Sequence, residues 1–159
     1  MAKFETPEAS QNVNPPYIGA VLRNVHEAVR DRLLREANNG GFDIVQAEFA
    51  VFQYPGPDGV RPAELARRCN LRKQAMNYTL SGLEARGYIT RETVPGRRAT
   101  FIRSTGRGRA LMSQFRATMA QIETEWSGRL GEDRFAELSA TLYDLAVWLG
   151  KLPARPHSQ

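Results

Sequence analysis

Cysteine, histidine and long apolar runs are scarce in this chain of 159 residues. Its single cysteine, Cys69, cannot form an intrachain disulfide and fits a reducing compartment. With only His26 and His157 beside it, a zinc site built from nitrogen and sulfur ligands is not expected. No apolar run approaches the roughly 18 residues of a membrane span, and the N-terminal segment contains no apolar signal core. We therefore expect a cytoplasmic protein that contains no metal and does not enter a membrane.

Sequence patterns typical of catalysis are also missing. There is no glycine-rich phosphate loop after a buried strand, no plausible Cys–His pair, and no local pattern of paired carboxylates. We therefore expect neither enzymatic activity nor a cofactor.

Positive charge is concentrated in the middle of the chain. Between Arg61 and Gly108 there are eleven Lys/Arg residues and three acidic ones, a net charge of +8, whereas the rest of the chain carries −3. This distribution indicates a surface that faces a polyanion. The alternative is a basic face that is merely solvated.

Apolar residues at spacings of three and four predict amphipathic helices toward both ends of the chain. The first stripe ends before "NNGG" and consists of Ile18, Leu22, Val25, Val29 and Leu33. Two further stripes run from Leu111 to Trp126 and from Phe135 to Leu152, with Gly131 between them. The short elements between these helices are too small to cover the stripes, so we expect a second copy of the chain to do so in a homodimer.

The middle of the chain predicts a helix–turn–helix. "PAELARRCN" forms a short helix, and a second helix begins near Leu71, with Asn70 as its N-cap, and runs to about Arg86. Gly87 can take the left-handed conformation that ends this helix. "YITRETV" and "ATFIRST" then predict a β-hairpin around the turn "PGRR".

The second of these helices has the residue types of a DNA-reading helix. Met76, Leu80 and Leu83 form an inward stripe, so an outward row is left that consists of Gln74, Asn77, Tyr78 and Ser81. Arg72 and Lys73 lie in the first turn, and no acid precedes Glu84. Amides pair with adenine, and cations reach guanine or phosphate. An indifferent polar face is the alternative.

The hairpin gains a role beside such a helix. Arginines in its turn can reach the DNA backbone or enter the adjoining minor groove, where negative potential is enhanced. Arg97 and Arg98 are the candidates, and Arg91 and Arg103 on the strands are weaker ones. The hairpin is therefore interpreted as a wing.

The order of elements resembles that of the MarR family of winged helix–turn–helix regulators. "LEARGYITR" is similar to the family's phrase at the end of the recognition helix, and "RRATFIRSTGRG" resembles its wing signature. The resemblance covers most of the chain, from about Tyr17 to Leu152. It implies a mainly α fold with a small β-hairpin wing, in which the winged domain spans 42–107, dimerisation helices span 14–39 and 109–152, and tails span 1–13 and 153–159.

The resemblance also implies a function. Family members are homodimers that bind pseudo-palindromic double-stranded DNA operators, usually as repressors, and many release DNA when a small aromatic or phenolic acid binds. The recognition-helix contacts carry over to Gln74, Asn77 and Tyr78, and the wing arginine carries over to Arg98. The chain departs from the family pattern at Thr93 and Gly96, where acids that brace the wing arginine often stand, and at Arg61, where a Ser or Thr cap is usual.

Several features leave alternatives open. The fold is also compatible with a winged-helix module that docks an acidic protein without specific DNA binding. His26 fits a hydrogen-bonded interface position or a sensor of ligand or pH. Cys69 fits the core better than a redox switch, because buried thiols are usually inert. Trp126, Tyr143 and Trp148 in the last two helices fit packing first and a ligand pocket second.

Overall fold

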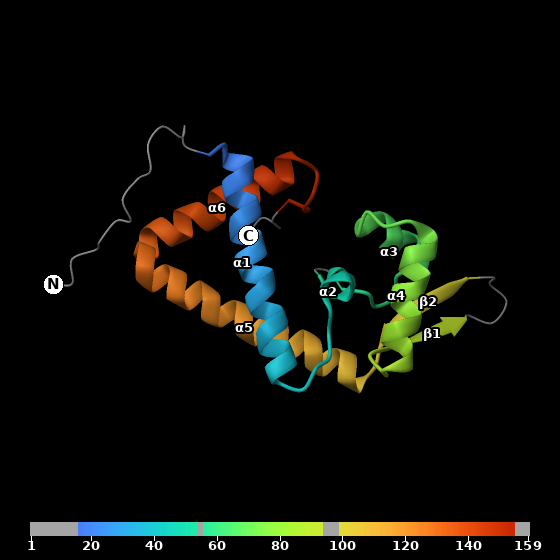
Figure 1. The fold of residues 1–159 in the computed structure, drawn as a ribbon. Coiled ribbons are helices and arrows are strands. Elements are labelled where there is room, and N and C mark those ends of the chain that lie inside the picture. Colours follow the sequence, from blue (N-terminus) through green and yellow to red (C-terminus); the bar gives the residue numbers. More distant parts are fainter. Residues whose placement is uncertain (1–15, 54–55, 94–98, 155–159) are drawn as a thin grey trace, which may run out of the picture.

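Six helices and a two-stranded hairpin make up the described part of the chain (Figure 1). A computed structural model describes residues 16–53, 56–93 and 99–154. In order, the elements are α1 (Ile18–Asn39), α2 (Gln46–Phe52), α3 (Pro62–Arg68), α4 (Lys73–Ala85), β1 (Ile89–Thr93), β2 (Thr100–Ser104), α5 (Gly106–Leu130) and α6 (Glu132–Trp148). The predicted mainly α fold with a β-hairpin is confirmed. The turn with Arg97 and Arg98, like the predicted tail 1–13, lies outside the described residues.

The chain is divided between a region of long helices and a compact region of short elements. α5 and α6 form a V that α1 crosses, and α2, α3, α4 and the hairpin gather at the far end of α5 (Figure 1). The lower half of α1 is fixed to α5 by Arg32, whose guanidinium donates to both carboxylate oxygens of Glu125, at 2.5 and 2.7 Å. Among the described residues, no helix is both long and apolar enough to cross a bilayer.

The turn between α3 and α4 differs from the prediction in one detail. Asn70 does not cap α4: it takes a left-handed φ of 52° and ends α3 instead. The N–H of Leu71 donates to the carbonyl of Ala66 at 2.8 Å, and that of Asn70 donates to Arg67 at 3.2 Å, the double closure of a Schellman motif. Asparagine suits this position because it tolerates left-handed backbone. α4 therefore begins two residues later than expected, after Arg72.

The end of α4 follows the prediction. Gly87 has a φ of +73°, and the N–H of Tyr88 donates to the carbonyl of Leu83 at 2.9 Å. The chain then turns directly into β1, which pairs with β2 in an antiparallel register that places Arg91 opposite Ile102. Gly59 and Val60 pair with the other side of β2 through Ile102, so β1 is the outer strand.

The start of α5 is packed unusually close to the end of α4. Thr105 caps α5 by accepting the N–H of Gly108 and also donates to the carbonyl of Tyr88. A Cβ on Gly108 would lie 2.1 Å from that same carbonyl oxygen. The second glycine of the "GRG" that follows the wing is therefore explained by a close approach that only glycine permits.

One hydrophobic core joins the short elements to α1 and α5. Met76, Leu80 and Leu83 of α4 are fully buried against Tyr88 and Ile102. The core reaches the long helices through Leu33, Ala37, Leu111 and Phe115. Because α4 presents its whole apolar stripe to this core, its opposite face is fixed toward solvent.

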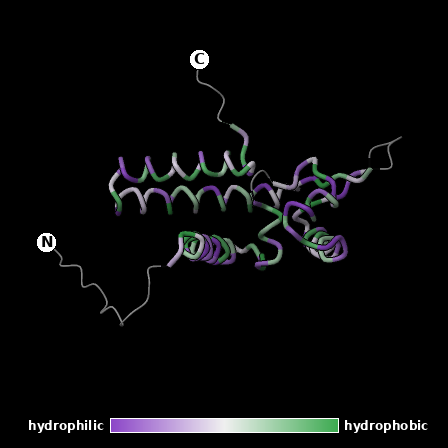
Figure 2. Tube along the Cα trace, turned by 90° about the horizontal axis from the view of Figure 1, so that it is seen from above, coloured by the Kyte–Doolittle hydropathy of each residue, from purple (hydrophilic) through white to green (hydrophobic). Residues whose placement is uncertain are grey.

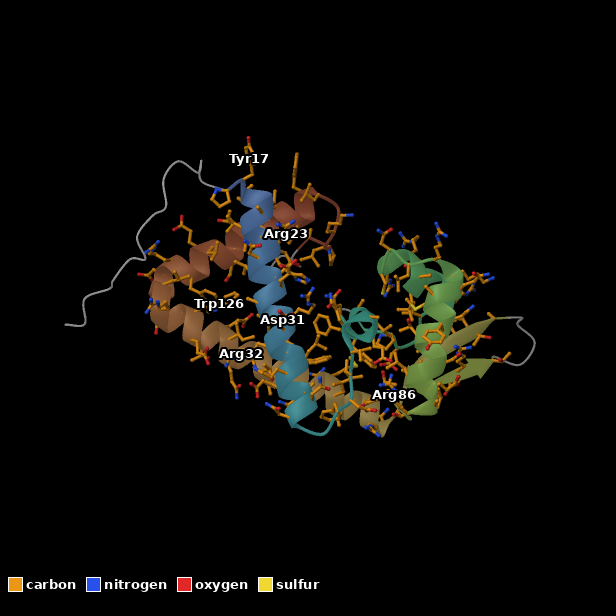
Figure 3. All side chains as sticks on the ribbon, viewed as in Figure 1. Tyr17, Arg23, Asp31, Arg32, Arg86 and Trp126 are labelled. Carbon is orange, nitrogen blue, oxygen red and sulfur yellow. The ribbon has the colours of Figure 1, made fainter. Side chains whose placement is uncertain are left out.

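The long helices keep large apolar side chains exposed. α6 has no buried residue, and its exposed stripe includes Leu138, Leu142 and Leu145. At the free end of α1, Tyr17 points away from the rest of the chain (Figure 3), and both it and Ile18 are exposed. Figure 2 shows hydrophobic positions recurring along these helices, with α1 seen end-on beside the pair formed by α5 and α6.

Candidate nucleic-acid interface

The outer face of α4 presents the side chains that the sequence predicted for it. Gln74 is exposed, Asn77 is partly exposed, and Tyr78 is 85% exposed. An almost fully exposed tyrosine on a helix whose other face is buried gains nothing from the core of its own chain. Its apolar ring and hydroxyl are suited to contact with a partner.

Cations surround the N-terminal end of this face. Arg72 and Lys73 are exposed, and within the described ranges neither forms an ion pair. On α3, Arg67 and Arg68 both bind Glu64, and their hydrogen bonds lower the pKa of this carboxyl from 4.5 to about 2. Part of the positive charge of α3 is thus neutralised, whereas that at the start of α4 is not.

The strands of the hairpin hold their arginines in different ways. Arg103 donates to Glu92 across the hairpin at 3.1 Å, and its side chain is 52% exposed. Arg91 turns toward α4 and contacts Asn77, Ser81 and Glu84. Both of these weaker candidates therefore already have an acidic partner. Arg61, before α3, lies over the ring of Phe101 at 5.6 Å, and so connects the start of α3 to the turn-side half of β2.

A polar network at the C-terminal end of α4 was not foreseen from the sequence. Arg86 bonds to the buried carboxylate of Glu48 on α2 and to the backbone carbonyl of Asp43. Asp43 accepts a hydrogen bond of 2.6 Å from the hydroxyl of Tyr88 and one of 3.0 Å from Arg107. Figure 3 shows Arg86 between α2 and α4.

Protonation states in this network follow from its contacts. The hydrogen bond from Tyr88 lowers the pKa of Asp43, which stays ionised. Burial, followed by the bond to Asp43, raises the pKa of Tyr88, which stays protonated. The sequence could not reveal the network because its members lie far apart in the chain and are joined only by the fold.

A cavity of about 540 Å³ lies between α1, α2 and α5. Its walls are almost entirely apolar and include Leu33, Phe49, Phe52, Met112, Phe115 and Met119. Arg116 is the charged residue among those that line it. The aromatic residues predicted as alternative pocket candidates lie elsewhere: Trp126 and Tyr143 line a smaller hollow between α5 and α6.

Cys69 is half-buried against the core. Its Sγ lies 3.4 Å from the carbonyl oxygen of Ala50, and burial raises the pKa of the thiol. Both observations agree with the interpretation of this residue as a packing position. In the described part of the chain, no group of three or more histidine, cysteine and acidic residues is placed to hold a metal ion.

The geometry defines a class of protein. A short helix, a tight turn, a second helix with an exposed polar face and a flanking β-hairpin form a winged helix–turn–helix. The described residues therefore have the architecture of the winged helix–turn–helix class.

Comparison with known proteins shows a similarity to one family. A sequence model of the MarR family matches residues 52–99. The MarR family protein Rv2887 of Mycobacterium tuberculosis, solved with salicylic acid, is 28% identical, covers 83% of this chain and 97% of its own, and superimposes with a TM-score of 0.60. No curated protein matches the sequence. This chain is therefore similar to MarR family transcriptional regulators, in sequence over residues 52–99 and in fold over most of its length.

Two more distant structures share the fold. The repressor CouR, solved on a 23-mer DNA duplex, is 23% identical, covers 81% of this chain and 92% of its own, and has a TM-score of 0.61. MepR, a regulator of a Staphylococcus aureus multidrug efflux pump, is 19% identical, covers 84% of this chain and 99% of its own, and has a TM-score of 0.62.

Proposed function

We propose that this chain is a homodimeric repressor that binds a pseudo-palindromic DNA operator and releases it when a small aromatic ligand binds. In this proposal α4 enters the major groove, where Gln74, Asn77 and Tyr78 contact bases. Arg72 and Lys73 bind phosphates beside it, and Arg97 and Arg98 of the wing reach the backbone or the minor groove. In this proposal the protein acts in the cytoplasm, where the DNA that it binds is also located.

The observation that carries the DNA-binding part of the proposal is the composition of the exposed face of α4. Tyr78 is 85% exposed beside Gln74, Arg72 and Lys73, while the opposite face of the helix is completely buried. The orientation of this face is therefore fixed by the core before any ligand binds, and little ordering is left for the encounter with DNA. Amide, phenol and cationic groups match base edges and phosphates.

The dimer is supported by the unpartnered apolar stripes. Large apolar residues are exposed in the first turns of α1 and along α6. These helices belong to the two regions proposed for dimerisation, 14–39 and 109–152. The winged domain proposed for 42–107 projects away from both (Figure 1). A twofold arrangement of this kind would present two copies of α4 to successive major grooves, about 34 Å apart.

The ligand part of the proposal is supported by the cavity. Its apolar walls suit an aromatic ring, and Arg116 can pair with an acidic substituent. Phe49 and Phe52 of α2 form one wall, and the neighbouring Glu48 binds Arg86 at the end of α4. A ligand that moves α2 would therefore act on the recognition helix through this ion pair.

The test of DNA binding begins with selection of duplexes from a random library by the wild-type protein. Affinity for the selected duplex is then measured by fluorescence anisotropy over a series of salt concentrations. If the dimer neutralises six or more phosphates, the logarithm of the association constant falls against that of the salt concentration with a slope of about −5 or steeper. Selection of no duplex would refute the proposal, and is the result expected of a module that docks acidic proteins.

The ligand is tested with salicylate as the probe. Salicylate should displace the selected duplex, and Arg116→Ala should weaken this effect, because the variant lacks the charge at the cavity. Salicylamide, which has the same ring without the carboxylate, is the matched control. Equal displacement by both compounds would contradict the role of Arg116.

A further inference from the structure

A charged side chain lies on the inward face of the wing. Side chains alternate along a strand, so Ile89 and Arg91 of β1 point to the same side. Ile89 is 1% exposed, and Arg91 stands opposite Ile102, which is fully buried. A guanidinium on this face needs partners, because an unpaired charge against a core is costly.

Among the residues that the structure describes, the guanidinium and the backbone N–H of Arg91 find their polar partners on α4. Its Nη2 donates to the backbone carbonyl of Asn77 at 3.2 Å and to the hydroxyl of Ser81 at 3.1 Å. Its Nε lies 3.4 Å from Oε2 of Glu84, and its backbone N–H donates to Oε1 of the same carboxylate at 3.1 Å. Asn77, Ser81 and Glu84 follow one another at spacings of four and three, so they share one face of the helix. One arginine thus spans two turns of α4.

These contacts involve the part of α4 that is proposed to read DNA. Asn77 and Ser81 belong to the outward row of the helix, and the charge of Arg91 is already matched by Glu84. We infer that Arg91 is a positioning residue that fixes the wing strand to the recognition helix and so sets sequence discrimination, instead of binding a phosphate. The inference rests on the proposed function, in which α4 enters the groove.

Arg103 provides the matched comparison. It lies on the neighbouring strand, pairs with a glutamate as Arg91 does, and has a side chain that is 52% exposed against 29% for Arg91. Its partner, Glu92, belongs to the hairpin itself, so Arg103 fastens β1 to β2 and not the hairpin to α4. A competing explanation for Arg91 is that an inward charge protects an outer strand from edge-to-edge pairing, which would affect aggregation but not DNA recognition.

The experiment compares affinity for the selected duplex with affinity for a random duplex of equal length, over a series of salt concentrations. Arg91→Gln should lower the ratio of the two affinities about fivefold, the lower end of the effect of losing one base contact, and should leave the salt slope unchanged. Arg91→Lys should behave like Arg91→Gln, because one ammonium cannot span the same acceptors. Arg103→Gln should preserve the ratio.

Two results would overturn the inference. A uniform loss of affinity with a salt slope reduced by about 1 would show that Arg91 neutralises a phosphate. We call the contacts of Arg91 with Asn77, Ser81 and Glu84 the brace. An unchanged affinity ratio would show that the brace does not affect recognition. Glu84→Gln gives an independent check. If only the negative charge mattered, the variant would bind every duplex more tightly, whereas loss of the brace should lower the ratio of the affinities for the selected and random duplexes.

A measurement without DNA separates this inference from the proposed function. Amide hydrogen exchange should become faster in β1 and the second half of α4 in Arg91→Gln, and should stay at the wild-type rate there in Arg103→Gln. Unchanged exchange in Arg91→Gln would refute the brace, whatever the protein binds. A wild-type protein that selects no duplex would refute the proposed function while the exchange result still decides whether the brace exists.

Discussion

Gly108→Ala tests the close packing between α5 and the end of α4. A Cβ at this position would lie 2.1 Å from the carbonyl oxygen of Tyr88, and contacts below 3.0 Å essentially do not occur. The first turn of α5 must therefore move by about 1 Å against a backbone that cannot yield by changing a rotamer. Such overpacking costs about 1–3 kcal/mol, and we expect the upper end because backbone meets backbone.

Gly106→Ala is the matched control for this variant. It lies in the same first turn of α5, and nothing stands within 4 Å of its Cβ position. Alanine gains about 0.5–1 kcal/mol over glycine inside a helix, so this variant should be neutral or slightly stabilised.

Thermal denaturation at one fixed protein concentration measures both variants, because the melting temperature of the proposed dimer depends on concentration. For a chain of this length, a loss of about 3 kcal/mol corresponds to a fall of about 6–12 °C. We expect that fall for Gly108→Ala and no fall for Gly106→Ala. Equal melting temperatures for the two variants would refute the packing argument.

The other predictions concern DNA, pH and assembly. Arg98→Ala should weaken binding to all duplexes similarly, whereas Gln74→Ala should reduce the preference for the selected duplex. Fluorescence anisotropy with the selected duplex and a random duplex distinguishes these effects. An unchanged affinity of Arg98→Ala would contradict the wing assignment. Glu64 has a native pKa of about 2, below its ordinary 4.5, so its stabilising effect should be complete above about pH 4.5 and disappear as pH falls toward 2. The wild-type protein should therefore have a higher melting temperature than Glu64→Gln at neutral pH but not at pH 2. A difference in melting temperature that persisted at pH 2 would argue against ionic pairing. Leu145→Asp should convert dimers to monomers in sedimentation velocity, whereas Thr141→Asp should not; a dimeric Leu145→Asp would exclude this part of α6 from the interface.

Much of the architecture could be predicted because its signals are local. Spacings of three and four located α1, α5 and α6, and Gly87 marked the end of α4. The buried row Met76, Leu80 and Leu83 followed from the same periodicity. The direction in which α4 faces could therefore be inferred before the fold was known.

Other features depend on contacts between distant segments and were not predictable. Asn70 carries signals both for an N-cap and for a left-handed helix end, and only the path of the turn decides between them. The inward direction of Arg91 depends on the register of β1 against β2, which a sequence of alternating polar residues leaves open. The bond between Glu48 and Arg86 joins two residues that lie 38 positions apart in the chain.

Footprinting of the protein on its selected duplex tests the central claim most directly, because it reports both the duplex contact and the pairing of two chains. We predict two protected segments related by twofold symmetry, with centres about 10 base pairs apart. Protection of a single segment, or none at concentrations that saturate binding, would contradict the claim that paired copies of α4 and the wing read one operator.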